Sequence, residues 1–351
     1  MMSQPVPVRT WTPLASTQPT GELSANTRPA RMRHVRVERQ DGVIRKLDLG
    51  GRVATFDEEN GALVGALLDH IDGVRSLREL AEVCGMELDD TVESVQRLYE
   101  LAIVRNVGEA LVPPLLYHTH IRAVALATQA RLGEAVQQLV PESTPRTVIG
   151  GLIENYHFVI ANAAHVSPAI VSAPTERVRM MWSDYLSDEY WHGVWLRQGL
   201  RAAGLSDDDI ARADPLPSTL AVINFLTLTS MVDPLAYAIC LTAGESLGET
   251  KGIASRRYDD MAALVGEEIV APFREHHVVD LDNHHNAVSA ELFVEVPPLN
   301  RRQQDAIYRA VLQYHQFVIE QGIQVARYYA DATSPLPFTA DQGERCYRAL
   351  A

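Results

Sequence analysis

Residues 273–287 concentrate histidine and aspartate in a pattern that is typical of a metal site. The run holds four histidines and two aspartates, and neither proline nor glycine interrupts it, so one helix is expected to pass through it. With 3.6 residues per turn, His276, Asp280 and His284 lie at i, i+4 and i+8 and share an arc of about 80° on one face. Two imidazoles and a carboxylate directed the same way suit a transition metal. The alternative is a solvated polar helix that is merely rich in histidine.

Two places upstream repeat ligand-type residues at helical spacing. Glu154 and His157 form one ExxH pattern, and Glu189 and His192 form another. Residues three apart lie on the same face of a helix, so each pattern can offer a carboxylate and an imidazole from one turn. Glu245 follows at the end of a very apolar segment. A single ExxH is common by chance, whereas ExxH, then an acid, then HxxxDxxxH is more specific.

The elements that would position these residues are helices. Beyond residue 114 the apolar residues recur with the helical period, and strand signals are absent. We therefore expect one all-α domain over residues 115–345, near the upper end of common domain sizes. Its expected helices cover residues 115–139, 146–165, 174–184, 188–203, 206–213, 218–231, 234–246, 258–271, 273–292 and 300–329.

The beginning of the chain has a different character. Residues 1–32 are rich in proline, serine and threonine, and we predict a disordered leader because they bury too little apolar surface to offset the entropy of ordering. Residues 33–108 open with short alternating runs separated by the turn signals Asp41-Gly42 and Gly50-Gly51. A small domain of strands and helices is therefore expected before the helical one.

Capping residues delimit the helices of this small domain. Asp72-Gly73 ends the first helix, Ser76 begins the second, Gly85 ends it, and Asp89 or Asp90 begins the third. The expected helices cover residues 58–71, 77–84 and 91–101, and a last strand covers residues 103–105.

Residues 68–85 and 95–104 carry a resemblance to a known family. The rhythm Asp-Gly, Leu, Leu-Ala, Gly resembles the PqqD-like winged-helix modules that recognise peptides in the biosynthesis of ribosomal peptides. In that family a leader peptide adds a strand to the sheet edge. DNA-binding winged helices share the rhythm, but the many acidic side chains here oppose contact with a phosphate backbone. A purely structural or dimerising role is the third interpretation.

The order of the helical motifs resembles the heme-oxygenase-like diiron oxidases and oxygenases, which share the helical fold of the PqqC and TenA proteins. The resemblance covers about residues 115–330 and implies two Fe(II) ions and dioxygen as co-substrate. The segment from Glu189 to Leu200 also looks like the family's E..HG..L…L helix. Carried over residue by residue, the implied metal ligands are Glu189, His192, Glu245, His276, Asp280 and His284.

One departure from that family concerns the last ligand. The family's motif is usually HxxxDxxH, whereas this chain has Asn283 at that position and the histidine one residue later. The doublets His276/His277 and His284/His285 leave the register open. The alternative ligand pairs are His277 with Asp280 and His285 with Asp282. These alternatives concern individual ligands and leave the expected site unchanged.

The first ExxH pattern has no place in that ligand set. We expect Glu154 and His157 to line the pocket as catalytic residues, with a polar stripe at a helix–helix contact as the alternative. Four histidines stand alone and are expected to be structural, namely His118, His120, His165 and His315. Arginines available to hold a substrate carboxylate are Arg256, Arg257, Arg301 and Arg302.

Length and composition limit the functional classes. The chain has 351 residues, which favours two domains, and a formal net charge of −14, which disfavours a nucleic-acid-binding surface. Three scattered cysteines form no disulfide framework and fit a reducing cytoplasm. We expect no signal peptide, and the most apolar stretch, residues 220–248, reads as two buried helices and not as a membrane span.

The sequence therefore predicts a mainly α protein: a heme-oxygenase-like helical bundle preceded by a PqqD-like domain. The resemblance implies a dioxygen-dependent diiron enzyme that oxidises an amino-acid-derived, peptide-borne or carrier-borne substrate in natural-product biosynthesis, by N-oxygenation or C–C cleavage. An external electron donor and a homodimer are compatible with it. The alternatives are a PqqC-like cofactorless oxidase, a TenA-like enzyme that would need a nucleophilic cysteine such as Cys240, and a DNA-binding regulator.

Overall fold

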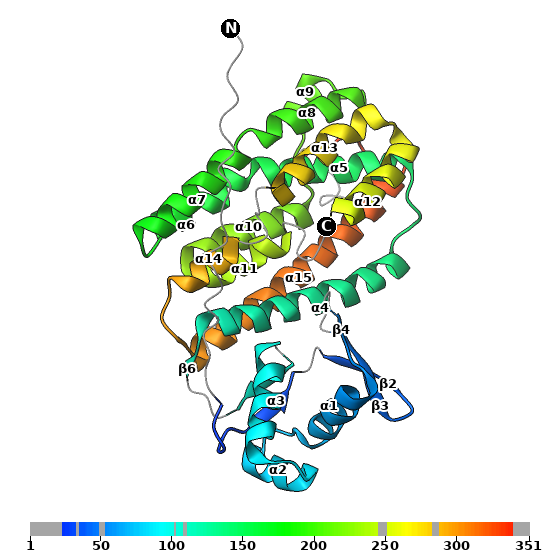
Figure 1. The fold of residues 1–351 in the computed structure, drawn as a ribbon. Coiled ribbons are helices and arrows are strands. Elements are labelled where there is room, and N and C mark those ends of the chain that lie inside the picture. Colours follow the sequence, from blue (N-terminus) through cyan, green and yellow to red (C-terminus); the bar gives the residue numbers. More distant parts are fainter. Residues whose placement is uncertain are drawn as a thin grey trace, which may run out of the picture.

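The computed structural model shows a long helical domain with a small strand-containing domain at one end (Figure 1). It describes residues 23–32, 35–48, 53–101, 103–107, 111–244, 251–282 and 288–339. The prediction of a mainly α protein is confirmed. Of the described helices, none combines the length and apolar character that a bilayer span requires.

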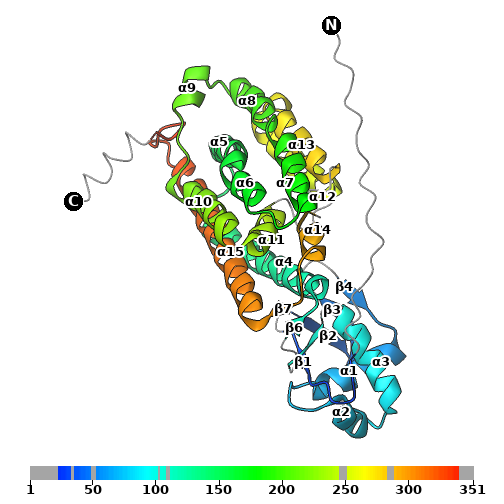
Figure 2. The same ribbon diagram turned by 90° about the vertical axis from the view of Figure 1, so that its left-hand side faces the viewer.

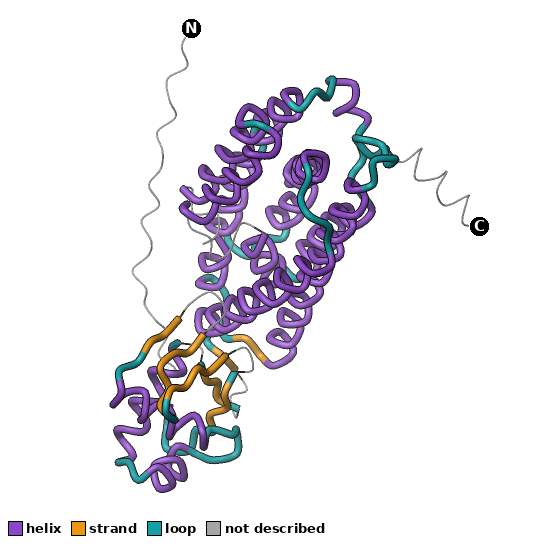
Figure 3. Tube along the Cα trace, turned by 90° about the vertical axis from the view of Figure 1, so that its right-hand side faces the viewer, coloured by secondary structure: helices purple, strands orange, loops and turns teal. Residues whose placement is uncertain are grey.

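The N-terminal domain is built from short antiparallel sheets and three helices, and it contains most of the strands of the described chain (Figure 3). Strand β1 pairs with β5, and β2, β3 and β4 form a three-stranded sheet. The elements are β1 (Pro29–Arg31), β2 (Arg36–Gln40), β3 (Val43–Asp48), β4 (Val53–Thr55), α1 (Glu58–His70), α2 (Leu77–Cys84), α3 (Leu88–Glu100) and β5 (Val104–Asn106).

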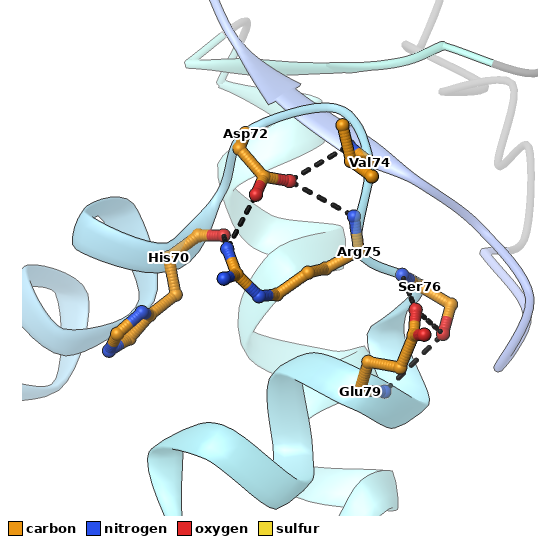
Figure 4. A network of polar contacts seen from close by, with 6 residues as sticks. All are labelled: His70, Asp72, Val74, Arg75, Ser76 and Glu79. Atoms are coloured by element: carbon orange, nitrogen blue, oxygen red, sulfur yellow. Dashed lines mark hydrogen bonds and ion pairs between the residues drawn. The ribbon is translucent and has the colours of Figure 1, made fainter.

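Local side-chain hydrogen bonds delimit α2 as the sequence predicts (Figure 4). Asp72 accepts hydrogen bonds from the backbone N–H groups of Val74 and Arg75, at 2.8 and 3.0 Å, and so closes the turn after α1. Ser76 and Glu79 form a reciprocal capping box, which satisfies N–H groups that the first helical turn leaves without partners. Gly85 ends the helix with φ of 64°, in the left-handed region that glycine adopts at little cost.

The structure differs from the expected leader at residues 23–32. Leu23 is buried, and its backbone N–H donates to the side chain of Gln96 at 3.1 Å. Pro29–Arg31 forms β1 against β5, with Arg31 opposite Val104. A low-complexity composition cannot reveal this strand, because its pairing partner lies more than seventy residues away in the sequence.

The helical domain packs helices in a bundle that α4 and α15 close on the side of the N-terminal domain (Figures 1 and 2). Its elements are β6 (Leu111–Val112), α4 (Pro114–Leu139), α5 (Pro145–Ile160), α6 (Asn162–Val171), α7 (Glu176–Glu189), α8 (His192–Ala202), α9 (Asp207–Arg212), α10 (Pro217–Val232), α11 (Pro234–Gly244), α12 (Lys251–Val265), α13 (Glu267–Asp282), α14 (Val288–Val294), β7 (Leu299–Asn300) and α15 (Arg301–Ala330).

Two local features depart from the expected all-helical domain. Strands β6 and β7 pair antiparallel, with Leu111 opposite Asn300, and join the linker to the start of α15. Two expected helices are each divided in two: one at Ala161, between α5 and α6, and one at residues 190–191, between α7 and α8. Two-residue strands are too short for a sequence pattern to show. Helix breaks also need a local signal, and these breaks contain neither proline nor glycine.

Two apolar cores flank the helices that carry the ligand-type residues. The larger core runs without interruption from the N-terminal domain into α4, α7, α10, α11 and α15. The smaller core lies among α5, α8, α12 and α13. The two domains therefore share one buried core, and the junction between them is a packed interface.

Candidate metal centre

The junction of α7 and α8 places Glu189 and His192 side by side. Glu189 is the last residue of α7 and His192 is the first of α8, and the two residues between them keep helical backbone angles. The rings of these two residues, Tyr190 and Trp191, are mostly exposed. Glu189 and His192 therefore still share a face, and Nδ1 of His192 lies 3.1 Å from Oε2 of Glu189.

Helix α13 supplies the other two members of the cluster. His276 and Asp280 are one turn apart, and Nδ1 of His276 lies 3.3 Å from Oδ2 of Asp280. Nδ1 of His192 lies 3.6 Å from Oδ1 of Asp280, and Nε2 of His276 lies 3.8 Å from Oε2 of Glu189. All four residues are buried, and one ligand atom from each lies within 4.8 Å of the others. Three helices, α7, α8 and α13, thus bring four donors to one point.

A glycine in α8, Gly199, allows α8 and α13 to approach each other closely. A Cβ atom built on Gly199 would lie 2.5 Å from the carbonyl oxygen of Ile269 and 2.7 Å from the ring of Phe273. Any other residue at this position would push the helices apart. The rings of His192 and His276 meet across this contact at 4.4 Å between centroids and 88° between planes.

The donor set fits a divalent transition metal. Burial lowers the pKa of His276, so that its imidazole is neutral and its lone pair is available at neutral pH, although the nearby Glu189 opposes this shift. Two carboxylates buried beside two imidazoles are costly without a positive charge to balance them. Imidazole and carboxylate together suit Fe(II), and the same ligands suit Mn(II).

Helix α6 contacts the cluster through a hydrogen bond to one of its carboxylates. Asn162 donates a hydrogen bond to Oε2 of Glu189 at 2.6 Å and so orients that carboxylate. His165, which is fully buried, lies one turn further along α6, and its Nδ1 lies 2.8 Å from the hydroxyl of Tyr237 on α11. Burial lowers the pKa of His165 to about 4, with Glu189 opposing the shift. Asn162 belongs to none of the sequence motifs above, although its spacing of three from His165 puts both on one face.

The first ExxH pattern lies outside this cluster. Glu154 accepts hydrogen bonds from the hydroxyl of Tyr329 at 2.8 Å and from the backbone N–H of Leu216 at 3.0 Å. Tyr329 packs directly against Gly150, where a Cβ atom would overlap its ring. Burial raises the pKa of Glu154. Glu154 therefore ties α5 to α10 and α15, which matches the alternative interpretation of a polar helix contact.

His157 shares that environment. It is buried, and burial lowers its pKa to about 4, with Asp214 opposing the shift. Glu154 and His157 remain candidates for a catalytic role only by their sequence pattern, because neither is among the four residues of the cluster.

Two of the six implied ligands, Glu245 and His284, lie outside the described residues, as does His285. The first doublet is described. His276 enters the cluster, whereas His277 lies beside Tyr258, with 5.9 Å between ring centroids.

Besides His165, two more of the lone histidines have structural partners. Nε2 of His118 lies 2.9 Å from the hydroxyl of Ser289, and Nδ1 of His315 lies 2.7 Å from the carbonyl oxygen of Val311. These contacts agree with the expectation that isolated histidines are structural. Cys240 is fully buried, and burial raises its pKa, which opposes the nucleophilic role that a TenA-like activity requires.

Part of the chain that carries this geometry is similar to a known protein family. Residues 151–317 match the Haem_oxygenas_2 family of iron-containing redox enzymes. This segment contains all four residues of the cluster, and the match confirms the expected heme-oxygenase-like fold for it. The N-terminal domain lies outside the match. No curated protein matches the sequence significantly.

A solved structure from Shewanella denitrificans OS217 is also similar, described as a domain of unknown function with a heme oxygenase-like fold. The two chains are 15% identical, with a TM-score of 0.47, and the alignment covers 60% of this chain and 88% of the other.

Proposed function

We propose that this protein is a non-heme diiron oxidase or oxygenase that uses dioxygen. The observation that carries the proposal is the buried quartet of Glu189, His192, His276 and Asp280, within a segment that matches a family of iron-containing redox enzymes. Glu245 and His284 complete the ligand set in this proposal, on the strength of the sequence motif.

Bound iron would supply the redox chemistry and the site at which dioxygen is reduced. The residues of the chain hold and shield it. His276 and His192 offer nitrogen donors, and Glu189 and Asp280 offer oxygen donors and balance charge. Asn162 keeps Oε2 of Glu189 in one orientation, and the apolar cores on both sides exclude water.

The N-terminal domain is proposed to present the substrate. Its three helices and small sheets are compatible with the PqqD-like resemblance, so a leader peptide or a carrier is the proposed partner. The substrate would then be amino-acid-derived or peptide-borne, and its oxidation would belong to a natural-product pathway in the cytoplasm. If the full-length protein binds no peptide encoded beside its gene, as measured by fluorescence polarisation, this role fails while the metal proposal stands.

The metal proposal is tested by measuring the iron content of protein loaded and purified without oxygen. We expect about two irons per chain in the parent protein. His276→Ala and Glu189→Ala should lose most of the iron, whereas His277→Gln, the adjacent control beside Tyr258, should keep it. Circular dichroism checks that each variant folds.

Other results would lead to different conclusions. A folded parent protein without iron would refute the proposal and favour the cofactorless oxidase. Equal iron loss in His276→Ala and His277→Gln would refute the assigned register of the doublet. About one iron per chain would refute the second iron and the ligand roles of Glu245 and His284.

A further inference from the structure

A cavity of about 460 Å³ lies at the junction of the two domains, and none of the four cluster residues lines it. One face of α4 and one face of α15 form its walls, and β1, β5 and the end of α3 close it. In Figure 1 this junction lies below α4, where the N-terminal domain meets the bundle. Its volume falls within the range of small-molecule sites, about 300–1,000 Å³, and is too small for a folded partner.

The cavity is positively charged within an acidic protein. Four arginines line it, namely Arg31, Arg105, Arg131 and Arg301, against a single lining carboxylate, Asp305. The formal net charge of the chain is −14, so a concentration of cations here departs from the average surface. Arg301 pairs with Asp305 at 3.2 Å. Arg31 and Arg131 make no ion pair with the described residues, which leaves two guanidinium groups for an incoming anion.

These two arginines come from different domains. Arg31 lies on β1 of the N-terminal domain and Arg131 on α4 of the helical domain, and both are exposed. A ligand that contacts both would therefore touch both sides of the junction.

Apolar and aromatic side chains also line the cavity. Tyr99 and Ile121 are almost fully buried within it. Tyr308 and Leu312, one helical turn apart on α15, are 41% and 37% exposed. Covering such side chains contributes roughly 25 cal/mol per Å² of apolar surface removed from water. A ligand with an apolar body gains from this surface, whereas a simple ion does not.

We propose that the junction cavity binds a small organic anion, a carboxylate or phosphate with an apolar body. The arginines of the wall hold the anionic group, and the body packs on the aromatic and aliphatic side chains of α3, α4 and α15. This site is separate from the metal cluster and stands whether or not the proposed oxidase activity is correct.

The test uses full-length protein and 1-anilinonaphthalene-8-sulfonate, a fluorescent anion with an apolar body, displaced by decanoate. We expect saturable binding at about one molecule per chain. Arg31→Ala and Arg131→Ala should each weaken decanoate binding about fivefold to tenfold, because each removes one charge-assisted contact. Tyr308→Ala should weaken it through the loss of apolar contact. Arg309→Ala, on α15 but outside the cavity lining, should leave binding unchanged.

Further competition experiments distinguish the contribution of the anionic group from that of the apolar body. Decanol should displace the probe at least about tenfold less well than decanoate, and inorganic phosphate alone should not displace it. Parental decanoate affinity in His276→Ala would show that the ligand is not bound at the metal cluster. The proposal is overturned if binding is not saturable, if decanol and decanoate bind equally well, or if phosphate alone displaces the probe. It is also overturned if Arg309→Ala weakens decanoate binding as much as Arg131→Ala does, or if His276→Ala weakens it.

Discussion

Replacing Gly199 by alanine tests whether the close contact of α8 and α13 creates the metal site. The added Cβ would lie 2.5 Å from a backbone carbonyl oxygen, that of Ile269, and 2.7 Å from the ring of Phe273. A backbone atom cannot rotate away as a long side chain can, so the helices must separate by several tenths of an ångström. That movement pulls His192 away from His276.

The expected change in the free energy of unfolding is the balance of two opposing effects. Replacing glycine by alanine within a helix stabilises the folded protein by about 0.5–1 kcal/mol. Overpacking a filled contact costs about 1–3 kcal/mol. Gly151, on α5, offers a matched control because a Cβ there meets no atom within 4 Å. We therefore expect Gly151→Ala to raise the free energy of unfolding, and Gly199→Ala to lie about 1–3 kcal/mol below it.

Urea denaturation of the metal-free proteins measures stability, and competition with a chelator measures iron affinity. Iron affinity should fall about tenfold or more in Gly199→Ala and stay at the parental value in Gly151→Ala, because donor positions must hold to about 0.5 Å. If Gly199→Ala matches Gly151→Ala in stability and keeps parental iron affinity, the helix contact does not set the ligand geometry.

Three further perturbations give distinct readouts. Asn162→Ala should weaken iron binding about tenfold, measured by chelator competition, because Glu189 loses the donor that orients it. Tyr329→Phe should lower the free energy of unfolding in urea by about 1–3 kcal/mol, because the buried Glu154 loses a hydrogen bond. Acidification from pH 7 to 5 should destabilise the protein, and His118→Asn should reduce that loss by about 2 kcal/mol at most.

The sign of the pH effect follows from burial. Burial lowers the pKa of His118 to about 3 in the folded protein, against 6.5 in the unfolded chain. Its contribution to stability is therefore complete above pH 6.5 and is lost as the pH falls towards 3. A parent protein whose stability is flat from pH 7 to 5 would contradict this reasoning.

Controls separate local effects from general damage. Ser167→Ala, also on α6, removes a hydroxyl that is bonded to its own helix, and it should keep parental iron affinity. Tyr190→Phe alters an exposed ring and should keep parental stability. Equal effects in a variant and its control would contradict the corresponding prediction.

Interactions that are local in sequence were predictable, because they depend on spacing alone. The i, i+4 relation of His276 and Asp280 and the i, i+3 relation of Glu189 and His192 place each pair on one face. The limits of α2 follow from Ser76 and Gly85 in the same way. The same spacing could not show that α8 and α13 would meet.

Long-range partners explain what the sequence could not predict. Glu154 repeats the ExxH pattern of Glu189, yet its surroundings are set by Tyr329, which lies 175 residues away. The burial of Leu23 likewise depends on α3, through Gln96. Chemical type and spacing identify candidates, whereas packing between distant segments decides which of them share a site.

Strands β6 and β7 connect the segment that follows the N-terminal domain to the start of α15. Asn300 pairs with Leu111 of the linker and also caps α15, a helix of 30 residues that spans about 45 Å and carries Tyr329 near its far end. Leu111 follows Asn106, the last residue of β5, by only five positions. The N-terminal domain also shares one buried core with the bundle, so the two domains form a packed unit. A molecule bound by the N-terminal domain would therefore reach the bundle at a local concentration set by this fixed geometry. A glycine–serine spacer inserted between the domains would instead make that concentration depend on the diffusion of a tethered domain.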